Sequence, residues 1–151
     1  MIKLLAEHIS AIEKHGERDY PHECCGLLLG EFLENGDRRV TETYPISNAR
    51  EEEAKRNRFL ISPEELLGGE RYAHEQGLEV IGFYHSHPDC EAKPSHYDLD
   101  HAWPTYSYII VSVYEGSADQ LRSWRLEPDR SRFNGEELSV VIRTAEPAEL
   151  F

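Results

Sequence analysis

Two histidines that lie one residue apart, His85 and His87, are the residues of this sequence best suited to metal chemistry. They follow an apolar run at 80–83, and side chains at i and i+2 of an extended strand point to the same face. Pro88 cannot donate to a sheet ladder, so the strand is expected to end there. A turn could bring Asp98 back beside them. Two neutral imidazoles, a carboxylate and a position for water form the ligand set expected of a catalytic zinc site.

Two features near these residues leave alternatives open. Two histidines and a carboxylate also describe the facial triad of non-haem iron enzymes, so the identity of the metal stays undecided. Cys90 could compete with water for the open position, although we favour a loop cysteine without such a role. His96 and His101 flank Asp98, but a fourth protein ligand would close the site. We therefore expect both to lie at the surface or behind the ligands.

The elements that position these residues begin with an amphipathic helix. Apolar residues recur at helical spacing through Ile2–Lys14, and Gly16 is expected to end the helix. Its histidines, His8 and His15, are expected to be solvated or packed at the helix edge.

A hairpin is predicted next. Glu23–Gly30 and Arg39–Ile46 are expected as paired strands, with turn residues at 35–37 between them. The charged segment 49–58 is expected to form an exposed loop, with a docking flap as the alternative, and 59–61 a short strand.

The second half of the chain is predicted to contain one helix followed by several strands. Ser62 and Pro63 are typical of a helix start, and Gly77 is expected to follow the end of that helix at about Gln76. Four strands are then predicted, at 78–85, 106–114, 120–126 and 138–143. Helices interleaved with strands indicate an α/β or α+β sandwich.

The spacing His85-x-His87-Pro88, six residues, then Ser95-x-x-Asp98, with Glu23 upstream before an apolar strand, resembles the JAMM motif. JAMM proteins, also called JAB1/MPN/Mov34 metalloenzymes, are zinc-dependent peptidases and isopeptidases that act at the tails of ubiquitin-like proteins. The resemblance runs from the first helix to about Val113. It implies one domain over residues 1–151, with a cytidine-deaminase-like, mixed and curved sheet flanked by helices.

The resemblance also implies a role for each matching residue. His85, His87 and Asp98 would bind one Zn²⁺ ion, and Glu23 would act as the general base. Ser95 would stabilise the oxyanion of the tetrahedral intermediate, while its structural role would be to cap the turn that presents Asp98.

A cysteine nucleophile is the weaker alternative. Cys24 and Cys25 lie in an apolar strand, where a thiol stays protonated and inert.

The substrate is inferred from the same resemblance. The chain is most similar to the small bacterial and archaeal JAMM proteins, which are associated with sulfur carriers resembling ThiS or MoaD that end in Gly-Gly. We expect hydrolysis of the bond after such a Gly-Gly tail. The alternatives are a deubiquitinase-like isopeptidase that cuts carrier–lysine conjugates, and a metal-dependent non-peptidase or a binding module of the same fold.

Composition excludes other function classes. A chain of 151 residues with a net charge of −13 argues against a broad basic surface for nucleic acid. No apolar run approaches the ~20 residues of a membrane span, and no signal-peptide core appears. Three cysteines do not form a disulfide framework, so a cytoplasmic location is expected. The acidity is explained by solubility or a high-salt host, or alternatively by a basic protein partner.

Overall fold

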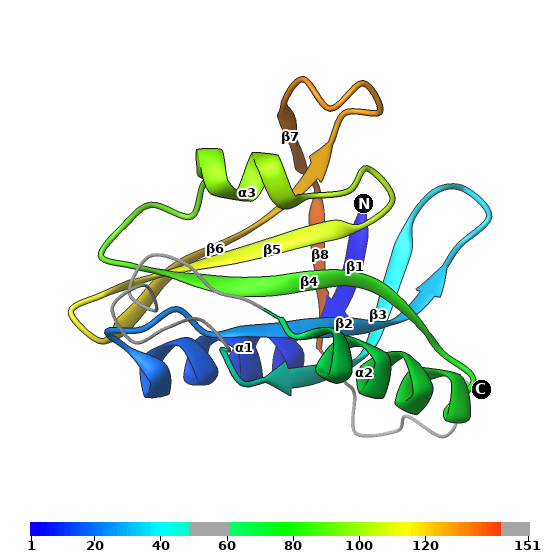
Figure 1. Cartoon of the computed structure of the whole chain (residues 1–151), viewed down its shortest axis with the longest axis horizontal. Helices are drawn as coiled ribbons and strands as arrows, with labels where there is room; N and C mark the ends of the chain where they lie inside the picture. The colour runs from blue at the N-terminus through cyan, green and yellow to red at the C-terminus, as the bar shows by residue number, and fades with distance from the viewer. Residues whose placement is uncertain (49–60, 143–151) are drawn as a thin grey trace.

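A computed structural model describes residues 1–48 and 61–142 (Figure 1). Its helices are α1 (Ala6–Asp19), α2 (Pro63–Glu75) and α3 (His96–His101). Its strands are β1 (Ile2–Leu5), β2 (Cys25–Phe32), β3 (Arg38–Ile46), β4 (Glu79–Pro88), β5 (Ser107–Tyr114), β6 (Ser117–Leu126), β7 (Phe133–Glu136) and β8 (Leu138–Val141).

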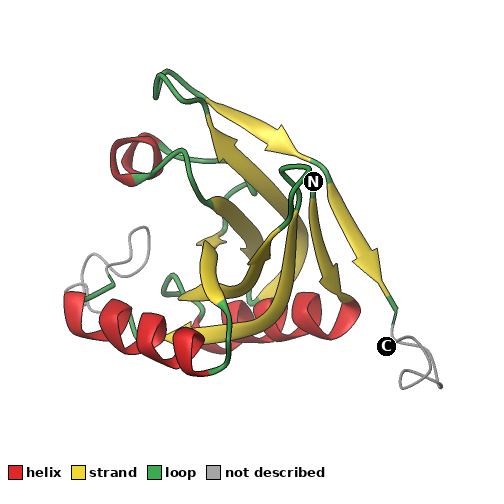
Figure 2. Ribbon diagram, turned by 90° about the vertical axis from the view of Figure 1, so that its right-hand side faces the viewer, coloured by secondary structure: helices red, strands yellow, loops and turns green. Residues whose placement is uncertain are grey.

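The described strands form one sheet in the order β7-β6-β5-β4-β2-β3-β1-β8. The sheet is mixed, because β4 pairs with β5 in parallel and with β2 in antiparallel fashion. It curves strongly, with helices packed against it (Figure 2). The predicted fold class, a curved mixed sheet flanked by helices, is confirmed.

Each face of the sheet carries its own apolar cluster. Leu28 of β2 packs with Ile12 of α1 and with Val111 of β5. The neighbouring Leu27, whose side chain points to the opposite face, packs with Ala73 of α2. These clusters clamp the middle of the sheet between α1 and α2, so β4 is held on both faces.

The start of the chain differs from the prediction. Ile2–Leu5 is strand β1, inserted between β3 and β8, and the helix begins only at Ala6. Ile2 and Leu4 are buried while Lys3 and Leu5 are half-buried, which is the period-two pattern of a strand. In so short a run the same apolar residues also fit helical spacing, so the strand was missed. Gly16 does not end the helix. It lies inside α1 where a Cβ atom would come 3.0 Å from Val113 Cγ2, so it lets the helix approach β5 closely.

Of the two alternatives expected for the histidines of α1, solvated or packed at the helix edge, solvation is wrong, because both are buried. His8 Nδ1 accepts a hydrogen bond from the backbone N–H of Leu5 at 3.0 Å and so satisfies a donor at the helix start. His15 Nδ1 lies 2.7 Å from the hydroxyl of Tyr84, a β4 residue that is only 1% exposed.

Several local predictions are confirmed. The 35–37 turn joins β2 to β3, with Gly36 at a φ of +88° that favours glycine. Ser62 caps α2 by accepting a hydrogen bond from Glu65 N at 3.2 Å, and Gly77 follows the helix at a φ of +73°. The strands predicted at 78–85, 106–114, 120–126 and 138–143 correspond to β4, β5, β6 and β8.

Other local predictions need correction or cannot be followed. Residues 49–58 lie outside the described part of the chain, as do 59 and 60 of the strand predicted at 59–61, and Ile61 is not in a strand. One boundary is confirmed, because Pro88 is the last residue of β4.

The short elements β7 and α3 were not predicted. No helix among the described residues is both long and apolar enough to cross a membrane.

Candidate metal centre

The two histidines lie at the end of β4, in the middle of the sheet. His85 is paired with Cys25 of β2 on one side and with Ile110 of β5 on the other. Both histidines are buried, and their Nε2 atoms are 3.2 Å apart. The i, i+2 spacing along a strand thus brings two ring nitrogens to one point, as the sequence predicts.

Asp98 reaches the histidines from α3 rather than from a simple turn. Its Oδ1 is 3.3 Å from His85 Nε2, and its Oδ2 is 3.3 Å from His87 Nε2. Ser95 caps α3: its Oγ accepts from Asp98 N at 3.1 Å, and its own N–H donates to Asp98 Oδ2 at 2.8 Å. This reciprocal pair orients the carboxylate toward the histidines.

The environment of Asp98 favours its ionised form. Burial opposes ionisation, but the electrostatic interaction with His85, hydrogen bonds to His85 and His87, and the N–H of Ser95 together hold the pKa of this carboxyl well below its usual range. A carboxylate kept ionised is the form in which it can bind a cation.

Glu23 also converges on this point. It is 3% exposed, and one of its carboxylate oxygens lies within 4.8 Å of the nearest ligand atoms of His85 and His87. The amide of Asn48 donates to the backbone carbonyl of Glu23 at 3.1 Å. On its other side, Cys24 N donates to Ser86 Oγ at 2.8 Å, which fixes the chain after Glu23 against β4.

The hydrogen bonding of His87 fits metal binding. Its Nδ1 lies 2.8 Å from the carbonyl oxygen of Glu91, which can only accept. Nδ1 therefore carries the proton, and the lone pair of Nε2 faces His85 and Asp98. Two imidazole nitrogens and carboxylate oxygens at contact distance are a donor set that suits zinc, so the residues fit the metal implied by the sequence.

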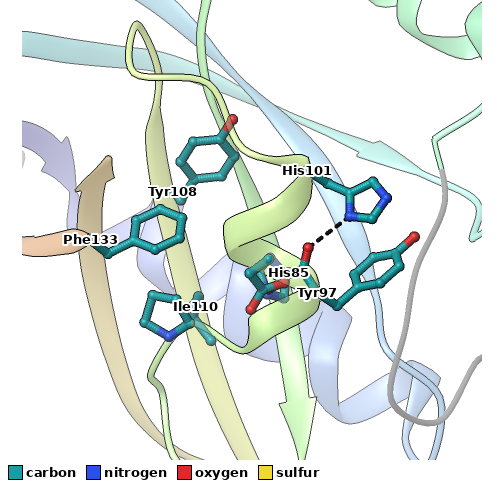
Figure 3. Close-up of a pocket in the computed structure, with 8 residues that line it drawn as sticks. His85, Tyr97, His101, Tyr108, Ile110 and Phe133 are labelled. Carbon is teal, nitrogen blue, oxygen red and sulfur yellow. Dashed lines mark hydrogen bonds and ion pairs between the residues drawn. The ribbon is translucent and has the colours of Figure 1, made fainter. Parts of the chain in front are cut away.

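The other candidate residues are exposed, although His101 also lines a small cavity beside His85 and Asp98. His96 and His101 are exposed, and the ring of His101 stacks on Tyr97 and hydrogen-bonds to its carbonyl (Figure 3). Cys90 is exposed in the loop after β4.

The cysteines beside Glu23 are fully buried. Burial raises the pKa of the Cys24 thiol to about 12, and it also raises that of Cys25. Both thiols stay protonated at neutral pH, so neither is activated as a nucleophile, as the sequence predicts.

A small cavity of about 40 Å³ lies beneath α3 beside His85 and Asp98. Aromatic rings of Tyr97, Tyr108 and Phe133 line it (Figure 3). Tyr108 comes from β5 and Phe133 from β7, two strands on the same side of β4. The cluster is thus bounded by apolar surface on one side, which limits access of water.

Sequence reasoning missed three supports of the site. Asn48 donates a hydrogen bond to the backbone carbonyl of Glu23, and the carbonyl of Glu91 accepts one from the ring of His87. Trp124 Nε1 donates to the Ala92 carbonyl at 3.0 Å and holds the loop between β4 and α3. An asparagine that follows a β-strand was the one available signal, and it is a weak one, because asparagine is common in turns.

Known proteins resemble this chain in sequence and structure. The family described as prokaryotic homologs of the JAB domain matches residues 5–127. A desampylase of Haloferax volcanii is 33% identical over 80% of this chain and 91% of its own length. A CysO-cysteine peptidase of Mycobacterium tuberculosis is 30% identical over 83% of each chain.

Among solved structures, a protein from Salinibacter ruber superimposes with a TM-score of 0.73 at 39% identity, covering 92% of this chain and 91% of the other. The family match covers most of the chain and includes all five residues of the candidate site. This chain belongs to the JAB-domain family, among its prokaryotic homologs.

Proposed function

We propose that this JAB-family hydrolase cuts the peptide or isopeptide bond that follows the C-terminal Gly-Gly of a ubiquitin-like or sulfur-carrier protein. The observation that carries the proposal is the convergence of His85, His87 and Asp98 on one point, with the carboxylate of Glu23 beside them. The kind of substrate rests on the relatives, which include a desampylase and a CysO-cysteine peptidase.

In this proposal Nε2 of His85, Nε2 of His87 and a carboxylate oxygen of Asp98 hold one zinc ion. When bound, zinc would lower the pKa of a water molecule toward ~7 and polarise the scissile carbonyl. Asp98 is already oriented for this task by Ser95, and His87 by the carbonyl of Glu91.

Glu23 is proposed as the general base. Its carboxylate would take a proton from the attacking water and then pass it to the leaving nitrogen, so that the amine departs neutral. Its position supports this role, because a carboxylate oxygen lies within 4.8 Å of the nearest ligand atoms of His85 and His87, in reach of a water held there. We place Glu23 outside the set of three metal-binding residues.

Ser95 is proposed to donate to the oxyanion. Its oxygen accepts the hydrogen bond from Asp98 N, which leaves the hydroxyl proton available for a second partner. The residue is exposed toward solvent, so a substrate carbonyl could reach it. Glycine at the cleaved position would let the substrate backbone approach the metal between β4 and α3 without a side-chain clash.

The proposal is tested by elemental analysis of protein purified without added metal, for the wild type and Glu23→Gln. We expect about one zinc per chain in both. Cleavage of a ubiquitin-like carrier extended beyond Gly-Gly should be lost only in Glu23→Gln, and a tail ending in Ala-Ala should be cut poorly.

Three results would contradict the proposal. Iron in place of zinc would support oxygen chemistry at the same ligands. No bound metal after soaking in zinc would support a binding module. Equal cleavage of Gly-Gly and Ala-Ala tails would remove the expected substrate preference.

A further inference from the structure

A groove of about 410 Å³ lies beside the start of α3, next to the candidate metal centre. Its lining includes Ser95, the proposed oxyanion donor, and Leu99 of α3. Pro94 and Phe133 line both this groove and the small cavity that contains His85 and Asp98. A molecule that occupied the groove would therefore lie beside the bond that is cut.

The charge of the groove is opposite to that of the molecule. Lys93 and Arg132 line it and no carboxylate does, although the chain as a whole has a net charge of −13. Lys93 Nζ forms an ion pair with Glu91 Oε2 at 3.4 Å, and both side chains are mostly exposed. Among the residues that the structure describes, the Arg132 guanidinium forms no ion pair within 4 Å. The carboxylate of Asp129, which accepts from Ser131 N at 2.9 Å, is close enough to interact with it electrostatically.

The groove also has an apolar part, one side of which is held in place. Leu99, Trp124 and Phe133 contribute its hydrophobic surface. The indole N–H of Trp124 donates to the carbonyl of Ala92, so one side of the groove is tied to the loop that carries Lys93. Cationic groups beside a fixed apolar surface are suited to a small molecule that carries both an anionic group and a side chain.

We propose that this groove receives the residue released by hydrolysis and binds its free α-carboxylate through Arg132, assisted by Lys93. A guanidinium can hold a carboxylate with two parallel hydrogen bonds, and no carboxylate in the described part of the chain holds Arg132 in such a pair. The inference rests on the proposed function and narrows it: the preferred substrate is a carrier extended by one C-terminal residue.

The same groove disfavours an isopeptide substrate. A lysine that leaves through its side chain brings an aliphatic stem and a new amine into the groove, and its own carboxyl is part of the conjugated protein's backbone. The two cations then have no anion to bind, and they repel an amine that becomes protonated on release.

Binding can be measured apart from turnover with the zinc-loaded Glu23→Gln variant. The probes are acetyl-Gly-Gly-Ala with a free carboxylate and the same peptide as its C-terminal amide, titrated while the indole N–H resonance of Trp124 is followed by NMR. We expect the carboxylate form to bind at least about ten-fold tighter than the amide.

Substitutions assign the preference to the groove. Arg132→Gln should abolish the difference between the two probes, and Lys93→Gln should reduce it less, because Lys93 is shared with Glu91. Arg39→Gln is the matched control, since Arg39 pairs with Glu31 on the β2–β3 hairpin. Equal binding of the two probes, binding of neither, or a preference that survives Arg132→Gln would overturn the inference.

Turnover by the wild-type enzyme separates this inference from the proposed function. We expect kcat/KM for a Gly-Gly-Ala tail to exceed that for a Gly-Gly tail joined to the side-chain amine of lysine. Faster cleavage of the lysine conjugate would overturn the inference and leave the hydrolase intact. If the carboxylate peptide binds more tightly but neither the Gly-Gly-Ala tail nor the lysine conjugate is cleaved, the carboxylate-binding groove is supported and the proposed function is refuted.

Discussion

The hydroxyl group of Ser95 caps α3 and is also proposed to stabilise the oxyanion, and the two tasks can be separated by substitution. Ser95→Ala removes the proposed oxyanion donor, so we expect kcat/KM to fall by ~10²–10³-fold. It also removes the cap of α3, which is typically worth ~1 kcal/mol of stability. Enzyme assays and urea unfolding would measure the two effects separately.

Ser95→Asp serves as the comparison for this prediction. Aspartate is as good a helix cap as serine but cannot donate to an oxyanion when ionised. Stability should be retained while activity stays low. Wild-type activity in Ser95→Ala would show that the hydroxyl serves only as a cap.

The cluster of His85, His87 and Asp98 was the most predictable part of the candidate site, because its geometry is nearly local. His85 and His87 share a face through strand geometry alone, and Asp98 follows within a short loop. The approach of Glu23 depends instead on the pairing of β2 with β4, which no local pattern encodes. The carbonyl of Glu91 could not be predicted from sequence, because every residue carries one.

At the scale of single elements, α1 should make stability depend on pH. Burial lowers the pKa of His15 from its ordinary value of 6.5, against the opposing effect of Asp19. The unfolded chain therefore binds a proton that the folded chain does not, and stability falls as pH decreases through about 6.5.

Thermal unfolding between pH 8 and pH 5.5 would measure this effect. We expect His15→Gln to lose part of the acid sensitivity and, at pH 8, to be less stable by about 1 kcal/mol, since the contact with Tyr84 is weakened. An acid sensitivity equal to that of the wild type would contradict the assignment to His15.

Helix α2 offers a matched pair of adjacent glycines. A Cβ atom at Gly68 meets nothing within 4 Å, so Gly68→Ala should stabilise the protein by ~0.5–1 kcal/mol through helix propensity. At Gly69 a Cβ atom would come 2.3 Å from Leu27 Cδ1 in the core, so Gly69→Ala should destabilise the protein by about 1 kcal/mol.

Chemical denaturation of the two variants provides the measurement. Shifts of the same sign would mean that the close packing of α2 on β2 does not hold in solution.

Short elements account for the errors in predicting the fold. β1 has four residues and continues directly into α1, so its two buried residues also fit the helical spacing of the next turns. β7 is equally short and includes Gly135, which weakens a strand signal. Longer elements such as β5 and α2 were predicted, because their patterns extend over several turns or alternations.

At the scale of the whole molecule, the proposed metal should contribute to folding stability. An ion that binds only the folded chain adds ~4 kcal/mol when its free concentration is 1,000 times its dissociation constant. A chelator should therefore lower the unfolding midpoint of the wild type by several degrees, as followed by calorimetry.

Two variants distinguish ligands from the proposed base. His87→Ala should show almost no response to the chelator. Glu23→Gln should respond like the wild type, since we place Glu23 outside the metal-binding set. A lost response in Glu23→Gln would instead make Glu23 a ligand.

The outermost strands β7 and β8 are separated in the chain by a single residue, Glu137, whose carbonyl accepts from Ile2 N at 2.9 Å. Local unfolding of the edge strand β7 is therefore expected to destabilise the opposite edge strand β8, and the reverse. β4 has three strands on one side and four on the other, so it is protected until both margins have opened. In native-state hydrogen exchange, the amide of His85 should exchange only through global unfolding, while that of Val140 exchanges through local opening of the margin.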